Sequence, residues 1–162
     1  MQVVELVRKY IDPKVFWKLP LDSQKQVLQL LFKDICDLYG VEGVELVVDV
    51  NPVMYRMTGG GCYNPSERKI CLYKISLMTF LHEVAHMLLG HSEKKARLWS
   101  HKVFYLAFPR LYLKNVKEGK FFHVLPVEEV ERFDEEMEME KVKKYLEEKL
   151  LEEIKRKGGE RV

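Results

Sequence analysis

Hydrophobic residues recur at intervals of three and four positions in five parts of the chain, a spacing typical of helices with one buried face. The expected helices cover residues 2–10, 22–39, 76–90, 92–108 and a charged segment from 126 onward. A proline or a glycine follows each of the first four, as is common after helix ends. The last carries a narrow apolar stripe that is expected to lie along the body of the protein or to pair with a partner chain.

Three short segments have the β-branched residues and partial alternation of strands. They are residues 44–50, 54–57 and 69–73. The last two flank glycine and Asn-Pro turn signals, and the glycines lack the spacing of a phosphate loop, so we expect a mobile hairpin or a close approach of substrate backbone there. Cys62 and Cys71 bracket the expected turn and can lie opposite each other, which leaves a disulfide between them open. Residues 110–125 alternate too weakly to be assigned.

A chain of 162 residues fits one domain with a core of its own. Its charge divides it into two parts, because residues 1–125 carry 18 Lys or Arg against 12 Asp or Glu, whereas residues 126–162 carry 9 against 13. We therefore assign residues 1–125 to the domain itself and residues 126–162 to a charged helical extension.

A cluster of eight cations in the region 94–120 faces few acidic residues and predicts a basic surface. Its members are Lys94, Lys95, Arg97, Lys102, Arg110, Lys114, Lys117 and Lys120. DNA is a partner that such a surface would attract, and a solvated surface without a partner is the alternative.

No segment has the basic start and long apolar core of a signal peptide, and no apolar run is long enough to span a membrane. Three cysteines do not make a complete disulfide framework, which agrees with a reducing compartment. We expect a soluble cytoplasmic protein without membrane contact, in which Cys36 is a small buried residue rather than a nucleophile.

The candidate chemistry is concentrated in the helix expected at residues 76–90, which contains the sequence HExxH from His82 to His86. Residues four apart lie on one face of a helix, so the two histidines can direct ring nitrogens to a single metal ion. Glu83 lies about 100° around the helix from His82, beside the ion rather than on it, where a carboxylate can act as a base. The alternative is a chance match in which both histidines belong to the core.

Catalytic zinc has three protein ligands and one open position, so a third ligand must come later in the chain. His101 is the first choice, because Ser100 can cap a helix there and leave the imidazole ring free to turn toward the first helix. Glu93 and His91 are the alternatives. His91 lies about 140° around the helix from the second histidine and reaches the ion only if Gly90 bends the chain back.

This part of the chain resembles the zinc-binding core of the SprT-like (Spartan) metalloproteases, in which HExxH is followed by a later His with an aromatic residue three positions on. His101 and Phe104 match that pattern, while Lys102 stands where the family usually has Gly. The resemblance covers roughly residues 55–108 and implies an action on DNA-bound protein, which fits the basic region. The zinc ligands and the base that it implies are His82, His86, His101 and Glu83.

A second resemblance is to the ImmA/IrrE-like gluzincins, in which an HExxHxxLxH-like sequence precedes a Glu ligand in an ExxA pattern. His91 and the segment from Glu93 to Ala96 are similar to it. This resemblance implies Glu93 as the third ligand, although the glutamate of that family generally lies much farther along the chain. Metzincins fit less well, because Leu89 and Ser92 stand where they need Gly and His.

Together these features predict an α+β, zincin-like metallopeptidase domain with a small sheet packed on the HExxH helix and a long C-terminal helix. It would bind Zn2+ and hydrolyse peptide bonds in a protein or peptide substrate, with Glu83 activating zinc-bound water. Residues 69–73 would form the sheet edge that holds the substrate. The alternatives are an ImmA/IrrE-like regulatory gluzincin and a non-catalytic zinc-binding module that binds DNA or a partner protein.

Overall fold

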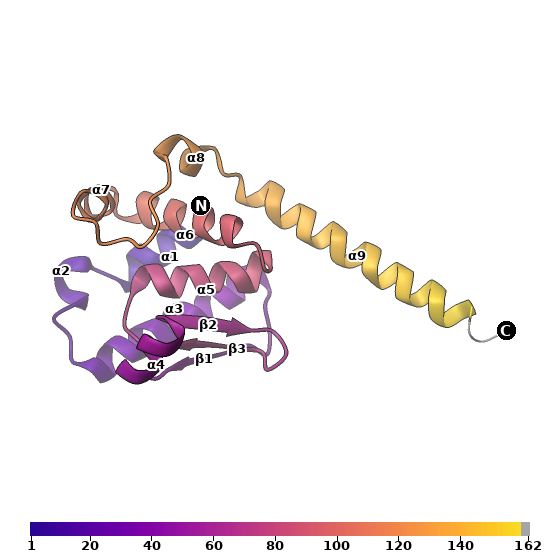
Figure 1. Cartoon of the computed structure of the whole chain (residues 1–162), viewed down its shortest axis with the longest axis horizontal. Coiled ribbons are helices and arrows are strands. Elements are labelled where there is room, and N and C mark those ends of the chain that lie inside the picture. Colours follow the sequence, from indigo (N-terminus) through magenta and orange to yellow (C-terminus); the bar gives the residue numbers. More distant parts are fainter. Residues whose placement is uncertain (160–162) are drawn as a thin grey trace.

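The HExxH helix lies between a small sheet and a layer of helices (Figure 1). The computed structural model describes residues 1–159. Its helices are α1 (Gln2–Tyr10), α2 (Pro13–Phe16), α3 (Leu21–Tyr39), α4 (Pro52–Thr58), α5 (Leu77–Leu89), α6 (Glu93–Ala107), α7 (Pro109–Lys117), α8 (Val127–Arg132) and α9 (Glu135–Gly159). Its strands are β1 (Glu45–Val48), β2 (Gly61–Asn64) and β3 (Lys69–Leu72). The predicted α+β class is confirmed.

The two central helices begin and end where the sequence predicts. Ser76 caps α5 by accepting a hydrogen bond from the Thr79 amide at 3.2 Å, and Gly90 ends the helix with a φ of 90°. Ser92 caps α6 in the same way, with the Lys95 amide as donor. Only three residues therefore separate the two helices, which brings the start of α6 back to the end of α5.

The three strands form one mixed sheet in the order β1-β3-β2. β3 pairs with β1 in parallel and with β2 in antiparallel orientation, so it is the central strand, with Ile70 and Leu72 fully buried. The prediction that residues 69–73 form the edge is therefore wrong. β2 is the edge strand next to α5, because β1 occupies the other side of β3.

The strand predicted at residues 54–57 is also wrong, because these residues belong to α4. The side chain of Asn51 accepts hydrogen bonds from the Val53 and Met54 amides, both at 3.1 Å, and Pro52 occupies the first turn. An Asn-Pro pair that ends one strand can equally start a helix when the Asn caps it. The first strand of the hairpin is β2 instead, and it pairs with β3.

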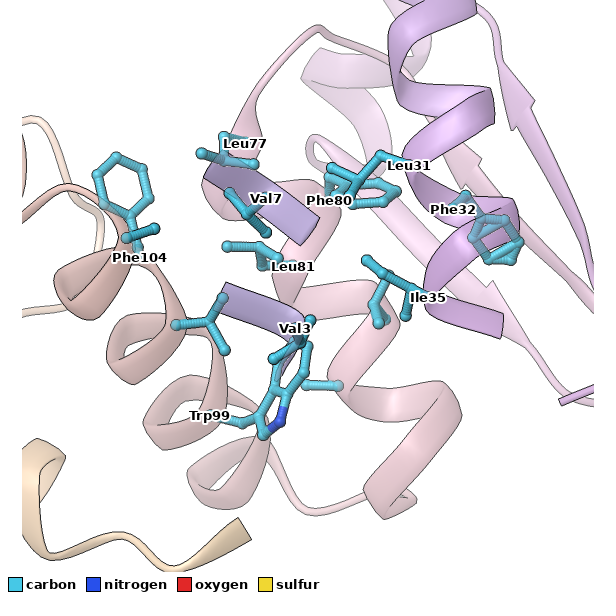
Figure 2. Close-up of a cluster of buried hydrophobic side chains, with 14 of the residues drawn as sticks. Val3, Val7, Leu31, Phe32, Ile35, Leu77, Phe80, Leu81, Trp99 and Phe104 are labelled. Atoms are coloured by element: carbon cyan, nitrogen blue, oxygen red, sulfur yellow. The ribbon is translucent and has the colours of Figure 1, made fainter. Parts of the chain in front are cut away.

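The hydrophobic core surrounds α5 on the sides away from the solvent (Figure 2). α5 is apolar on most of its circumference, as expected for a helix covered by neighbours on several sides. The labelled core side chains come from α1 (Val3, Val7), α3 (Leu31, Phe32, Ile35), α5 (Leu77, Phe80, Leu81) and α6 (Trp99, Phe104). This packing holds the helix that carries the two histidines in a fixed position.

The C-terminal segment is two helices rather than the single helix predicted from residue 126. Phe133 and Asp134 separate α8 from α9, and the buried side chains of Val130 and Phe133 attach the segment to the domain. The indole of Trp99 donates a hydrogen bond to Glu135 at 2.9 Å. α9 begins in contact with α5, where Met139 packs against the core, and then extends away from the other elements (Figure 1). The apolar side chains from Tyr145 to Ile154 are exposed rather than packed along the body.

No helix within residues 1–159 is long and apolar enough to cross a membrane.

Cys62 and Cys71 are directly opposite each other across β2 and β3, as the hairpin pattern predicts, and both are free thiols. Cys36 is buried, and burial raises the pKa of its thiol to about 11. The thiolate is the reactive form, so at pH 8 only about one Cys36 molecule in a thousand is reactive.

We expect iodoacetamide at pH 8 to alkylate the exposed Cys62 in the folded protein and to leave Cys36 unmodified. Mass spectrometry of tryptic peptides after timed quenching measures the order, and the same reaction in denaturant provides the control. Modification of Cys36 at the rate of Cys62 in the folded protein would contradict its burial.

Candidate metal centre

His82 and His86 lie one turn apart on the same face of α5, and their Nε2 atoms are 3.2 Å apart. Glu93, the first residue of α6, places its carboxylate against both rings. Its Oε2 lies 3.2 Å from His82 Nε2, and its Oε1 lies 2.8 Å from His86 Nε2. Three metal-ligating side chains therefore converge on one point within 4.8 Å of one another.

The arrangement of these donor atoms fits a metal ion. Two ligand atoms bound to tetrahedral zinc lie about 3.3 Å apart, close to the 2.8 and 3.2 Å separations of this group. His86 Nδ1 lies 2.8 Å from the Gly90 carbonyl, which can only accept a hydrogen bond, so the proton of the neutral ring belongs on Nδ1. The lone pair of Nε2 then faces a carboxylate oxygen, and only a proton or a metal cation between the two makes that contact favourable.

The prediction of His101 as the third ligand does not agree with this geometry, which brings Glu93 to the histidine pair instead. Glu93 is at the first turn of α6, and a residue eight positions further lies about 12 Å along the helix axis. The ring of His101 is buried, and its Nδ1 is 2.8 Å from the Tyr112 hydroxyl. His91 is exposed and is not part of the converging group.

Ser100 does not cap a helix that starts at His101. It lies inside α6, where its hydroxyl donates a hydrogen bond to the Ala96 carbonyl at 2.8 Å. Burial, and then the charge of His82, lowers the pKa of His101 to about 4, so this ring is neutral at physiological pH. His101 nevertheless lines the pocket beside the histidine pair.

Glu83 is buried beside the converging group and is not one of its three members, as its rotation around α5 predicts. Burial raises the pKa of its carboxyl to about 7, although the charge of His86 and a hydrogen bond from the Tyr63 backbone work in the opposite direction. A carboxyl with a pKa near neutral can both take up and release a proton under ordinary conditions.

The electrostatics of Glu93 differ from those of Glu83. Burial works to raise the pKa of Glu93, but the positive charges that His82 and His86 carry when protonated outweigh it, so the pKa lies below its ordinary value. The two carboxyls that face the same pocket are therefore suited to opposite roles. Glu93 stays ionised as a ligand does, and Glu83 is able to exchange a proton.

Two glycines allow the edge strand to lie close to α5. A Cβ atom at Gly60 would be 3.1 Å from the Thr79 hydroxyl, and one at Gly61 would be 2.8 Å from the Cys71 carbonyl oxygen. Any larger residue would push β2 away from the HExxH helix. Close contacts with Thr79 of α5, with Lys74 at Gly60 and with the Cys71 carbonyl of β3 at Gly61 therefore explain these two glycines within the fold.

The group opens into a pocket of about 220 Å3. Met78, Thr79, His82 and Glu83 of α5, Glu93, Arg97, Ser100 and His101 of α6, Gly60 and Gly61 before and in β2, and residues 121–123 line it. From the sequence, Arg97 belongs only to a general basic cluster, and residues 121–123 have no assigned role. The spacing of four positions between Glu93 and Arg97 was the available signal, because it puts both on one face of α6.

Comparisons with protein-family models, with curated proteins and with solved structures each give no match.

Proposed function

We propose that this chain is a zinc-dependent metallopeptidase of zincin-like fold, in which His82, His86 and Glu93 hold the metal and Glu83 is the catalytic base. The observation that carries the proposal is the convergence of the three donor groups, with the buried carboxyl of Glu83 directly beside them. A site with three protein ligands leaves a fourth position open, which is typical of catalytic rather than structural zinc.

The ligand set favours the ImmA/IrrE-like resemblance over the SprT-like one. The gluzincin pattern takes its third ligand from a glutamate followed three positions later by alanine, and Glu93 and Ala96 have that spacing. The short connection through Gly90 explains how a glutamate so close to the second histidine can still reach it. We therefore infer a His-His-Glu centre.

Each residue of the centre has a separate task in hydrolysis. When bound, zinc supplies Lewis-acid chemistry and lowers the pKa of water in its open position. The hydrogen bond between His86 and the Gly90 carbonyl orients the ring and leaves Nε2 as donor to the metal. The carboxylate of Glu83, buried beside the ligands, accepts a proton from the attacking water and delivers it to the leaving amine.

A peptide substrate in extended conformation fits beside β2. The backbone amide of Tyr73 donates a hydrogen bond to the carbonyl of Gly60, so Gly60 is in a hydrogen-bonded pair. Such pairs alternate with non-hydrogen-bonded pairs along an antiparallel ladder. The backbone N–H and C=O of Gly61 therefore point to the side of β2 that has no strand partner among residues 1–159. Strand addition to a free sheet edge is a common mode of peptide capture. The edge for such capture is β2 rather than the segment 69–73.

The alternative of a non-catalytic module that binds DNA has less support. Four of the eight cations between residues 94 and 120 have other partners or surroundings, and one of them is Lys120, which forms an ion pair with Glu118 at 3.1 Å. Lys95 forms an ion pair with Glu138 at 2.9 Å, Lys102 donates to the Glu131 carbonyl at 3.1 Å, and Arg97 lines the pocket. The cations that remain are Lys94 on α6 and Arg110, Lys114 and Lys117 on α7, which make a smaller basic surface.

Purified protein is expected to contain about one zinc per chain and to hydrolyse casein, an unstructured substrate. Dialysis against a strong chelator should remove both metal and activity. Because the three ligands are preorganised, one equivalent of zinc should restore both. Elemental analysis and release of acid-soluble peptides measure the two quantities. A zinc content near zero that stays unchanged after dialysis against zinc would contradict the proposal.

A further inference from the structure

Arg97 extends into the pocket beside the proposed metal centre. It lies one turn after Glu93 on α6, and its charge acts on rings on both sides of the pocket. Burial is the main cause of the lowered pKa values of His82 and His101, and the charge of Arg97 contributes to both. Arg97 lines the same pocket as His82 and His101, and among the residues that line it only Glu83 and Glu93 bring negative charge.

The guanidinium of Arg97 lacks adequate partners within the described part of the chain. Its contact with the Glu93 carboxylate is 3.9 Å long, beyond hydrogen-bond distance. Its Nε is buried, and among residues 1–159 it has no hydrogen-bond acceptor. Buried donors of charged groups are normally hydrogen-bonded in native proteins, and the residues from 1 to 159 supply no acceptor for this nitrogen.

The position of Arg97 is not explained by a role in holding the Glu93 carboxylate in place. Both carboxylate oxygens of Glu93 are turned toward His82 and His86, at 3.2 and 2.8 Å. A cation bound by these three ligands would repel the guanidinium, because both carry positive charge. An arginine in this position becomes favourable when an anion binds in the pocket between them.

We propose that Arg97 binds a carboxylate of the peptide substrate in this pocket, next to the bond that is cleaved. The inference rests on the proposed function and names the substrate class as peptides with an acidic group at that position. The guanidinium is 3.9 Å from a candidate metal ligand, so the acidic group belongs to a residue adjacent to the scissile bond. The carboxylate is either an Asp or Glu side chain or the C-terminal carboxylate of the peptide.

The shape of the pocket agrees with a single acidic side chain. Its volume of about 220 Å3 is smaller than that of typical small-molecule sites, which begin at about 300 Å3. Met78 and Phe121 supply apolar surface for the methylene groups of the substrate residue. Phe122, whose side chain is 96% exposed, offers further apolar contact at the opening.

Binding rather than turnover tests the proposal. The protein is zinc-loaded Glu83→Gln, in which peptides stay intact, and the probes are three fluorescent peptides of otherwise neutral sequence. One has a central Glu and an amidated C-terminus, the second has Gln in place of Glu, and the third has Gln with a free C-terminal carboxylate. Fluorescence anisotropy gives each dissociation constant.

We expect the peptide with Glu, or the one with a free carboxylate, to bind about tenfold more tightly than the neutral peptide, as expected for one charge-assisted ion pair. Which of the two binds identifies the source of the carboxylate. Adding Arg97→Gln should abolish the difference and leave the zinc content unchanged. The matched control is Arg110→Gln, which removes an equal charge from an exposed position on α7 and should preserve the difference.

Equal binding of the three peptides, absence of binding by all of them, or a preference that survives Arg97→Gln would overturn the proposal. Loss of zinc from the Arg97→Gln variant would overturn it as well, since the arginine would then support the metal centre. A protein that binds acidic peptides through Arg97 but cleaves none when Glu83 is intact would refute the proposed peptidase and retain the carboxylate site.

Discussion

Replacing Glu83 by Gln is expected to leave zinc binding intact and to lower hydrolysis of casein by about 100-fold to 10,000-fold, the usual contribution of a general base. Gln has the size and shape of Glu but cannot take up the proton of the attacking water. Glu83 is buried beside the three candidate ligands and is not one of them, so the metal should remain. Zinc content and initial rates at equal protein concentration measure both effects.

The matched control makes the same chemical change ten positions along the chain. Glu93→Gln removes a negative oxygen from the converging group and should lose zinc and activity together. The two variants thus separate a base from a ligand. Cleavage by zinc-loaded Glu83→Gln at the rate of the parent protein would exclude Glu83 as the base, whatever its pKa.

The helices around the site could be predicted from the sequence because their signals are local. Ser76 and Gly90 mark the ends of α5, and the apolar spacing between them requires no knowledge of the rest of the fold. The position of Glu83 relative to His82 follows from helix geometry alone. The pairing of Cys62 with Cys71 follows from the hairpin, whose two strands are close in the chain.

The errors have causes that are not local. β3 was expected at the edge because it precedes the HExxH helix, but the order of strands depends on β1, which returns to pair with it from more than twenty residues away. Asn51 and Pro52 carry signals for the end of a strand and for the start of a helix, and both operate here. α7 covers the first half of residues 110–125. It starts at Pro109, which is also the proline that ends α6.

The preference for His101 over Glu93 as third ligand has a related cause. Whether Glu93 can reach the histidine pair depends on the direction of the chain after α5. Gly90 and Ser92 can be recognised as the end of α5 and the cap of α6, but the direction in which the chain leaves Gly90, where φ is 90°, cannot be derived from residue spacing. The separation of His86 and Glu93 in the sequence is short for two ligands of one ion on consecutive helices. A sharp reversal of the chain between α5 and α6 makes this short separation sufficient. The buried partner of His101, the hydroxyl of Tyr112, comes from α7, which was not predicted.

The third ligand can be identified by zinc titration against a competing chelator. Glu93→Ala is expected to weaken zinc binding by more than about 100-fold, because loss of a supporting group that does not bind the metal typically costs only about 10-fold to 100-fold. His101→Ala should change the affinity by less than about tenfold, since its Nδ1 is bonded to Tyr112 and the ring is outside the converging group. His91→Ala, at an exposed position, should leave the affinity unchanged.

His101 is buried, so its replacement can loosen the fold, and a second variant separates stability from ligation. His101→Gln keeps a polar side chain in the place of the ring, and circular dichroism of both metal-free variants verifies that α5 and α6 are intact. Zinc affinity that falls by more than 100-fold in folded His101→Gln and persists in Glu93→Ala would assign the third ligand to His101. The SprT-like arrangement would then replace the His-His-Glu centre, and the short turn at Gly90 would have no role in metal binding.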